Sequence, residues 1–395
     1  MEVTQIYETV NSITNEVLGK SDILKEDLSN IVDVGTELFS ATSVDNYVKS
    51  LVNRIGKVVF VNRTYKGRVP SVVMDAWQFG SVLEKLQADL PQATENETWD
   101  LVDGQSYDEN IFYKPSVSAK FFNSKITFEI PLSFTERQVR ESFGSPEELN
   151  AFLSMLYNSV EKSMTLKTDA LVMRTINNMI AQTYSNDTDG NKAINLLARY
   201  NENNDTALTV DKCLTDSDFL RYATMTISLY VSRFATMSTI FNVGGKPRFT
   251  PKDYLHLVML SDFIESSRTY LQADTIHREL LELPNSDTVP FWQASGDSFD
   301  FEDVSKINVT IKDNATTKDV AISGILAVMF DRDALGVSNL DRRVTTHYNA
   351  KAEFFNNWYK FDAGYYNDLN ENFVFFYVAD TSSETSNVAS TRAKK

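Results

Sequence analysis

The sequence predicts an α+β protein built around one very long helix. Three observations support this fold class. Residues 145–182 combine a helix start with an apolar period that neither proline nor glycine interrupts after the first turn. Residues 125–130 alternate apolar and polar side chains, as a half-buried strand does. Residues 349–379 are rich in aromatic and strand-forming residues, which predicts further strands near the carboxyl end.

The first 124 residues divide into two segments of different character. Residues 1–61 contain short helical patterns joined by polar linkers and end in an apolar strand at Val58–Val61. Residues 62–124 form a long polar excursion with an acidic stretch at 95–109 and few large apolar residues. Loops of this length in compact proteins are usually functional or mobile. We therefore expect a projecting segment with strands at its base and no core of its own.

The long helix is predicted from its start and from its spacing. Ser145 is a suitable N-cap, Pro146 fits the first helical position, and Glu148 completes a capping box. At 1.5 Å per residue, about 35 residues would span roughly 50 Å. We expect this helix to be continuous and to pack on the strand that contains Ile126. The apolar residues expected in its core are Leu149, Phe152, Leu153, Leu156, Val160 and Met164.

The remainder of the chain reads as a mixed unit followed by strands and a tail. Residues 211–348 carry helical patterns at 216–237 and 250–281, then strand-like runs at "KINVTI" and "ISGILAVMF". Residues 349–380 are predicted to be strands. Residues 381–395 are polar, and we expect a disordered tail.

Composition excludes several classes of protein. With 395 residues, 42% of them hydrophobic, the chain can bury a large core, and no apolar run reaches membrane-spanning length. The amino terminus shows no secretory signal. A net charge of −16 argues against a broad basic face for nucleic acid. Cys213 is the only cysteine, so no disulfide can form within the chain.

A search for catalytic motifs finds none. Asp331 and Asp333 follow a strand closely enough to suggest a metal or acid–base pair, although a solvated strand end explains them more simply. His256, His277 and His347 are scattered along the sequence. The aromatic run at 354–366 could stack on sugars, or it could pack in a sheet. We assign no catalytic, cofactor-binding or metal-binding residue, and a carbohydrate-active enzyme remains a distant alternative.

The order of segments resembles the major capsid proteins of tailed bacteriophages, which share the Hong Kong 97-like fold, and among them those of phi-29-like small podoviruses. The resemblance rests on "SLVNRIGKVVF", "YKGRVP", "AFLSMLYNSV", "YLHLVMLSDF", "GILAVMFDRDAL" and "NNWYKFDAGYYNDLNENFVFFYV". It implies an N-terminal arm (1–61), an extended loop (62–124), a peripheral domain (125–210) with a spine helix (about 145–182), an axial domain (211–348), returning peripheral strands (349–380) and a tail (381–395).

The resemblance also implies a function and partners. The chain would be a self-assembling subunit of an icosahedral or prolate phage head that encloses double-stranded DNA. Its partners would be copies of itself in hexamers and pentamers, a scaffolding protein, a portal and nearby DNA bound without sequence specificity, with no membrane. It would be assembled in the host bacterial cytoplasm and reside in the virion. An encapsulin-like compartment is the alternative, although those subunits are usually shorter and lack so long a loop.

The extended loop is expected to order by lying across a neighbouring subunit. The alternative is that it folds back on its own subunit as a small subdomain. The residues expected to make the contact between subunits are Lys66, Arg68, Trp77, Phe79, Val82 and Leu86.

Overall fold

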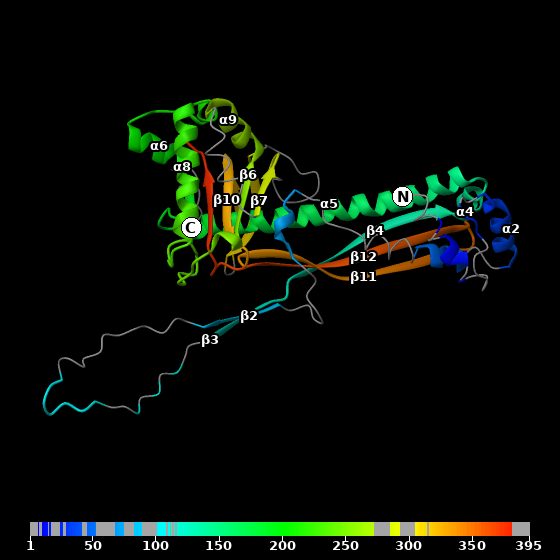
Figure 1. The fold of residues 1–395 in the computed structure, drawn as a ribbon, viewed down its shortest axis with the longest axis horizontal. Coiled ribbons are helices and arrows are strands. Elements are labelled where there is room, and N and C mark those ends of the chain that lie inside the picture. The colour runs from blue at the N-terminus through cyan, green and yellow to red at the C-terminus, as the bar shows by residue number, and fades with distance from the viewer. Residues whose placement is uncertain are drawn as a thin grey trace.

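The protein has two bodies joined by one long helix, with a hairpin projecting beyond one end (Figure 1). The computed structural model describes residues 7, 10–14, 16, 24–26, 29–41, 46–52, 68–74, 83–88, 101–107, 110, 112, 114, 117–271, 285–292, 305–313 and 316–380. The strand expected at Val58–Val61 and the tail at 381–395 lie outside these residues.

The joining helix is α5, Pro146–Asn186, and its 41 residues run without a break. Ser145 caps it, because its hydroxyl accepts a hydrogen bond from the Glu148 amide at 3.2 Å. The prediction of one continuous helix is confirmed, and the helix extends four residues beyond the expected end. A capping box between Thr135 and Gln138 starts the short helix α4 just before it.

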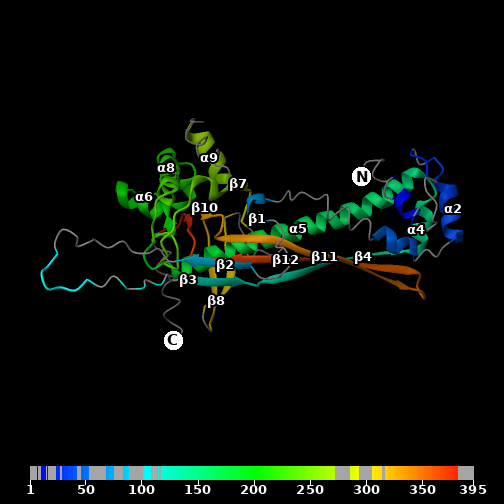
Figure 2. The ribbon, with the colours of Figure 1, turned by 60° about the horizontal axis from the view of Figure 1, so that its bottom comes forward.

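A four-stranded sheet lies along α5 in the order β1-β11-β12-β4 (Figure 2). Strand β12 pairs with β4 and with β11 in antiparallel register over most of their length. In β4, Ile126, Phe128 and Ile130 face away from solvent while Lys125, Thr127 and Glu129 are exposed. The predicted alternation is therefore confirmed. The strands are β1 (Val73–Met74), β4 (Lys125–Thr135), β11 (Leu335–Asn349) and β12 (Phe354–Asn367).

The second body is a five-stranded sheet in the order β5-β13-β10-β6-β7, packed with short helices. Its central strands β10 and β6 are buried at every residue. Gly324 opens β10 with φ 76°, and a Cβ there would collide with the Val378 carbonyl oxygen. The elements are β5 (Ala193–Asn195), β6 (Leu255–Leu260), β7 (Asn285–Val289), β10 (Ile325–Asp331), β13 (Phe373–Tyr377), α6 (Leu196–Asn204), α7 (Val210–Cys213), α8 (Ser217–Phe234) and α9 (Ser261–Leu271).

Smaller elements complete the described fold. A hairpin of β8 and β9 packs on α5, and a second hairpin of β2 and β3 runs toward the end that carries α6 and α8 (Figures 1 and 2). Helix α2 lies at the opposite end. The bounds are α2 (Ile31–Ala41), η1 (Pro70–Val72), β2 (Leu83–Ala88), β3 (Val117–Phe122), α4 (Glu136–Ser142), η3 (Lys252–Tyr254), β8 (Ile307–Asp313) and β9 (Thr316–Ile322).

Helix α5 serves two hydrophobic cores. Near its start, residues spaced three or four apart face a core shared with α2, α4, β4 and β12. From Leu171 to Ala181 it enters the core of the five-stranded sheet. The first half of the helix is buried along one stripe, whereas the second half is buried on almost every side.

Two expectations about this part of the chain need correction. The helix predicted at 250–281 is wrong at its start, because Leu255–Leu260 forms strand β6, which lies between β10 and β7. A short, wholly buried apolar run fits either structure by its spacing alone. The boundary expected at residue 348 falls inside β11, which pairs with β12, and β13 belongs to the five-stranded sheet. The chain therefore passes between the two sheets more often than the sequence indicated.

Replacing Leu156 with Asp tests the stripe on α5. Leu156 is fully buried, so a carboxylate there would be both misfitted and uncompensated. We expect a loss of about 3–5 kcal/mol or more in the free energy of unfolding. Urea unfolding of the soluble subunit measures it. Asn158→Asp, exposed half a turn away, is the matched control and should change little. Similar stability of both variants would contradict the assigned core.

Candidate functional site

The acidic pair after β10 is built into a turn. Asp331 is buried, its Oδ2 accepts a hydrogen bond from Thr250 Oγ1 at 2.6 Å, and its Oδ1 accepts one from the Asp333 amide at 2.9 Å. Asp333 itself is exposed. Burial raises the pKa of Asp331, and its two hydrogen bonds partly oppose that effect. Both oxygens of Asp331 thus hold the turn together, so Asp331 is a buried structural group and not the solvated strand end expected, whereas Asp333 is exposed as expected.

The other candidate groups are also structural. His256 lies in β6, stacked on Phe330, and burial with the nearby Arg332 lowers its pKa to about 4. The Cys213 thiol donates to the Val210 carbonyl, and burial raises its pKa to about 11. A buried imidazole with a pKa near 4 is a weak base, and a protonated thiol is a poor nucleophile at neutral pH. His277 lies outside the described residues.

The aromatic run at 354–366 is core on one face of β12, and its remaining rings, Phe354, Trp358 and Tyr365, are half-buried. In β12, Phe355, Tyr359 and Phe361 are buried against α5. Phe355 packs beside Phe134 of β4 at a ring distance of 5.9 Å. A sugar platform needs exposed ring faces, and these rings have none. The structure therefore gives no support to the carbohydrate-active alternative.

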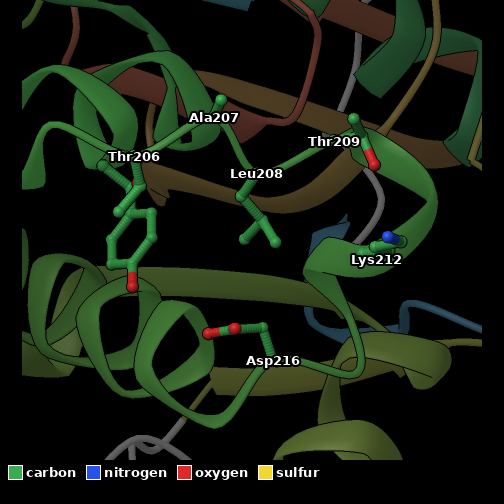
Figure 3. A pocket seen from close by; sticks show the side chains of 7 residues that line it. Thr206, Ala207, Leu208, Thr209, Lys212 and Asp216 are labelled. Carbon is green, nitrogen blue, oxygen red and sulfur yellow. The ribbon is translucent and has the colours of Figure 1, made fainter.

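A cavity of about 280 Å³ opens between α6, α7 and the start of α8 (Figure 3). Asp216 is the acidic group there, but its Oδ1 already accepts the Phe219 amide as the N-cap of α8. Burial and the charges of Asp216 and Asp218 raise the pKa of Tyr200, which keeps the phenol protonated. The residues that line the cavity therefore offer no activated nucleophile. They are Tyr200, Thr206, Ala207, Leu208, Thr209, Lys212 and Asp216.

The part of the chain that the structure describes also lacks two other features. Within it, no group of three or more His, Cys, Asp or Glu residues could hold a metal ion. No helix within it is long and apolar enough to cross a membrane.

The exposed apolar surfaces indicate the function more directly than the buried polar groups do. Beyond the β2–β3 hairpin, the chain turns back at a tip that lies far from both bodies in either view (Figures 1 and 2). Leu101 and Val102, in the segment 101–107, are 65% and 61% exposed, and Phe112, further along the same loop, is 83% exposed. Large apolar side chains exposed on a projecting loop mark a surface for contact with another protein. The sequence reasoning missed these three, although "TWDLVDG" and "NIFY" place them in the acidic stretch or next to it.

A second exposed apolar stripe follows α8. Met225 and Leu229 lie one turn apart on its exposed face, and Met237, Ile240 and Phe249 in the segment after the helix are exposed as well. Each of these side chains is about half exposed. The spacing of Met225 and Leu229 was visible in the sequence, but nothing there distinguished this face of α8 from the buried one.

The structure describes only some of the residues that were predicted to make contact between subunits. Lys66, Trp77, Phe79 and Val82 lie outside the described residues, and Leu86 forms a backbone pair with Ala119 in the hairpin.

The expectation for Arg68 differs from the structure, because Arg68 forms an ion pair within its own chain. Its amide and Nε donate to the two carboxylate oxygens of Asp169 on α5, at 2.9 and 2.6 Å. Its guanidinium also lies over the Phe291 ring. Arg68 therefore anchors the chain to the middle of α5, and in this subunit it does not reach outward.

The predicted spine-helix residues lie together on one stripe of α5. Leu149, Leu153, Leu156, Val160 and Met164 are buried in the core with α2, α4, β4 and β12. Phe152 is partly buried at the edge of that core, in edge-on contact with Phe134.

This architecture is similar to that of solved phage capsids. A chain in the capsid structure of Staphylococcus phage Andhra superposes with a TM-score of 0.54 at 10% identity, over 80% of this chain and 86% of that one. A chain in the capsid structure of Cyanophage P-SCSP1u gives 0.47 at 12% identity, over 82% and 94%. At such identity the likeness to the Andhra capsid shows the fold alone: the Hong Kong 97-like fold of a phage capsid subunit.

Sequence comparison then gives the family. Residues 10–377 match the Phi29-like phage major capsid protein family, so this chain belongs to that family. No curated protein matches the sequence. The resemblance stated from the sequence is confirmed, and the chain is a subunit of a capsid shell.

Alanine variants of the acidic pair test the absence of catalysis and of a metal. Asp331→Ala leaves Thr250 and an amide without their acceptor, so we expect a loss of about 1–3 kcal/mol in the free energy of unfolding. Asp333→Ala, exposed and two residues away, is the control and should change little. Elemental analysis of chelator-washed protein should find no stoichiometric transition metal, and finding one that Asp331→Ala removes would contradict this account.

Proposed function

We propose that this chain is the repeating subunit of a closed phage head that encloses double-stranded DNA, and that its extended loop joins neighbouring copies. The observation that carries the proposal is the exposure of Phe112, Leu101 and Val102 on the loop that projects beyond the β2–β3 hairpin. Membership of the capsid family supports assembly from many copies. Phe112 has the highest exposed fraction of the large apolar residues in the described part of the chain, so its loop is suited to covering a neighbour.

The stripe on α8 supports a second contact between copies. The hairpin points toward the same end of the molecule as α6 and α8 (Figures 1 and 2). A copy held by the loop on that side lies at the end of the subunit that carries α8, where Met225 and Leu229 are exposed. Contacts in which different surfaces of two identical subunits meet generate closed rings when the rotation closes. Rings of this kind are the hexamers and pentamers that we propose for the shell.

The remaining partners follow from the family and from charge. We propose a scaffolding protein and a portal as assembly partners, the host bacterial cytoplasm as the place of assembly, and no enzymatic activity. The net charge of −16 fits a container wall that lies beside packaged DNA without holding it. Binding to DNA should therefore be weak and independent of sequence.

Replacing Phe112 with Asp tests the role of the tip. Burial of an aromatic ring contributes about 1.5–3 kcal/mol, and a carboxylate at the same place adds a desolvation cost. We expect the yield of assembled shells to fall by about tenfold or more at equal protein concentration. Sedimentation and electron microscopy of the variant, expressed with its neighbouring genes, measure the yield.

Gln105→Asp is the matched control for this experiment. It adds the same charge to the same exposed tip but removes no apolar side chain. It should assemble like the parent, and both variants should leave the melting temperature of the free subunit unchanged. Normal shells from Phe112→Asp would count against the loop as the joint between copies.

A further inference from the structure

The inner face of the β2–β3 hairpin carries two lysines directly opposite each other. Lys85 and Lys120 are cross-strand partners, and Leu83 and Phe122 form the next pair on the same face. Like charges that face each other across two strands destabilise an isolated hairpin. This hairpin therefore needs acidic groups from elsewhere in the chain.

Those acidic groups lie in the turn between β12 and β13. Lys85 Nζ is 2.6 Å from Glu371 Oε1 and 3.1 Å from Asp368 Oδ2, and Lys120 Nζ is 2.7 Å from Asp368 Oδ1. Arg248 Nε joins the network at 3.1 Å from Glu371 Oε1. The Asp368 side chain has no exposed surface, whereas that of Lys85 is 20% exposed. The most buried member is thus a carboxylate held between two cations from the loop.

The electrostatics and the packing beside it agree with this geometry. Burial alone would raise the pKa of Asp368, but the hydrogen bond from Lys120 and the charge of Lys85 bring it below its usual value. Phe122 packs on Tyr366 of β12 at a ring distance of 5.0 Å, so an apolar contact adjoins the ion pairs. The base of the loop is therefore attached to its own subunit at more than one point.

We propose that Lys85, Lys120, Asp368 and Glu371 form a latch that holds the base of the extended loop against the β12–β13 turn and fixes the direction in which the loop leaves the subunit. A buried ion pair contributes little net stability, but removing one partner leaves an uncompensated charge and is strongly unfavourable. Such a network therefore favours one orientation over others. The direction matters because the tip must reach a neighbour. The role of the latch in assembly therefore rests on the proposed function, whereas the ion pairs themselves do not.

Hydrogen exchange on the free, full-length subunit tests the latch without any assembly. Lys85→Met should speed exchange of the β2 and β3 backbone amides by about tenfold or more. If the lysines were not engaged, the same change would relieve their mutual repulsion and slow exchange. The sign of the effect decides between the two, and unchanged or slower exchange would overturn the proposal.

Control and second variants make the result specific. Glu84→Gln lies on the opposite, exposed face of β2 and should leave exchange unchanged. Glu371→Gln removes a negative charge from the turn and should speed exchange in the hairpin while α5 stays protected. A hairpin that exchanges equally in the parent and in Glu371→Gln would count against the latch.

A distance measurement tests the direction of the loop. Spin labels on Ala119→Cys in the hairpin and Lys351→Cys in the body, both exposed sites, should give a narrow distance distribution in the parent background and a broad one with Lys85→Met. The buried Cys213 should not react. Identical distributions would show that these charges do not set the direction. Normal assembly of Phe112→Asp would instead affect only the proposed role of the tip.

Discussion

The structure depends on one helix that is long enough to take part in two hydrophobic cores. Helix α5 gives one stripe of side chains to the core near α2 and α4, and it is buried almost all round where it meets the five-stranded sheet. The strands of the four-stranded sheet run alongside it, and β12 contributes residues to both cores. The broad, elongated shape follows from this, because neither core has to wrap around the other.

The attachment of the extended loop follows from the same arrangement. On one side, Arg68 bonds to Asp169 in the middle of α5, close to where the two cores meet. On the other, the lysines of the hairpin bond to the turn that links β12 to β13, where the chain passes from one sheet to the other. Both ion pairs join the loop segment to parts of the fold that α5 and β12 hold in place. The loop is therefore attached to the rigid frame, and its apolar tip remains free to contact another protein.

Local patterns predicted most of the frame, because the interactions that define it are local. A cap at Ser145 followed by an apolar period was enough for α5, and alternation was enough for β4. Strand β6 was taken for a helix because a run buried on all sides carries no period that distinguishes the two structures. The resemblance to capsid proteins, which rests on the order of segments, is confirmed by the family match.

Local sequence patterns could not predict the exposed apolar surfaces or the latch, for a different physical reason. Lys85 and Asp368 lie 283 positions apart, and no pattern in either segment indicates the other. The exposure of Phe112 and Leu229 likewise depends on what the rest of the fold leaves uncovered. Arg68 was expected at a neighbouring subunit because its partner, Asp169, lies 101 residues away on a helix whose neighbours were unknown.

The measurement that most directly tests the central claim compares hydrogen exchange at residues 101–114 in free subunits and in assembled shells. If the tip lies across a neighbouring copy, its amides should exchange rapidly in the free subunit and become protected in the shell. The β2–β3 hairpin should be protected in both states, because its contacts lie within one chain. Equal exchange at the tip in both states would contradict a loop that joins the shell.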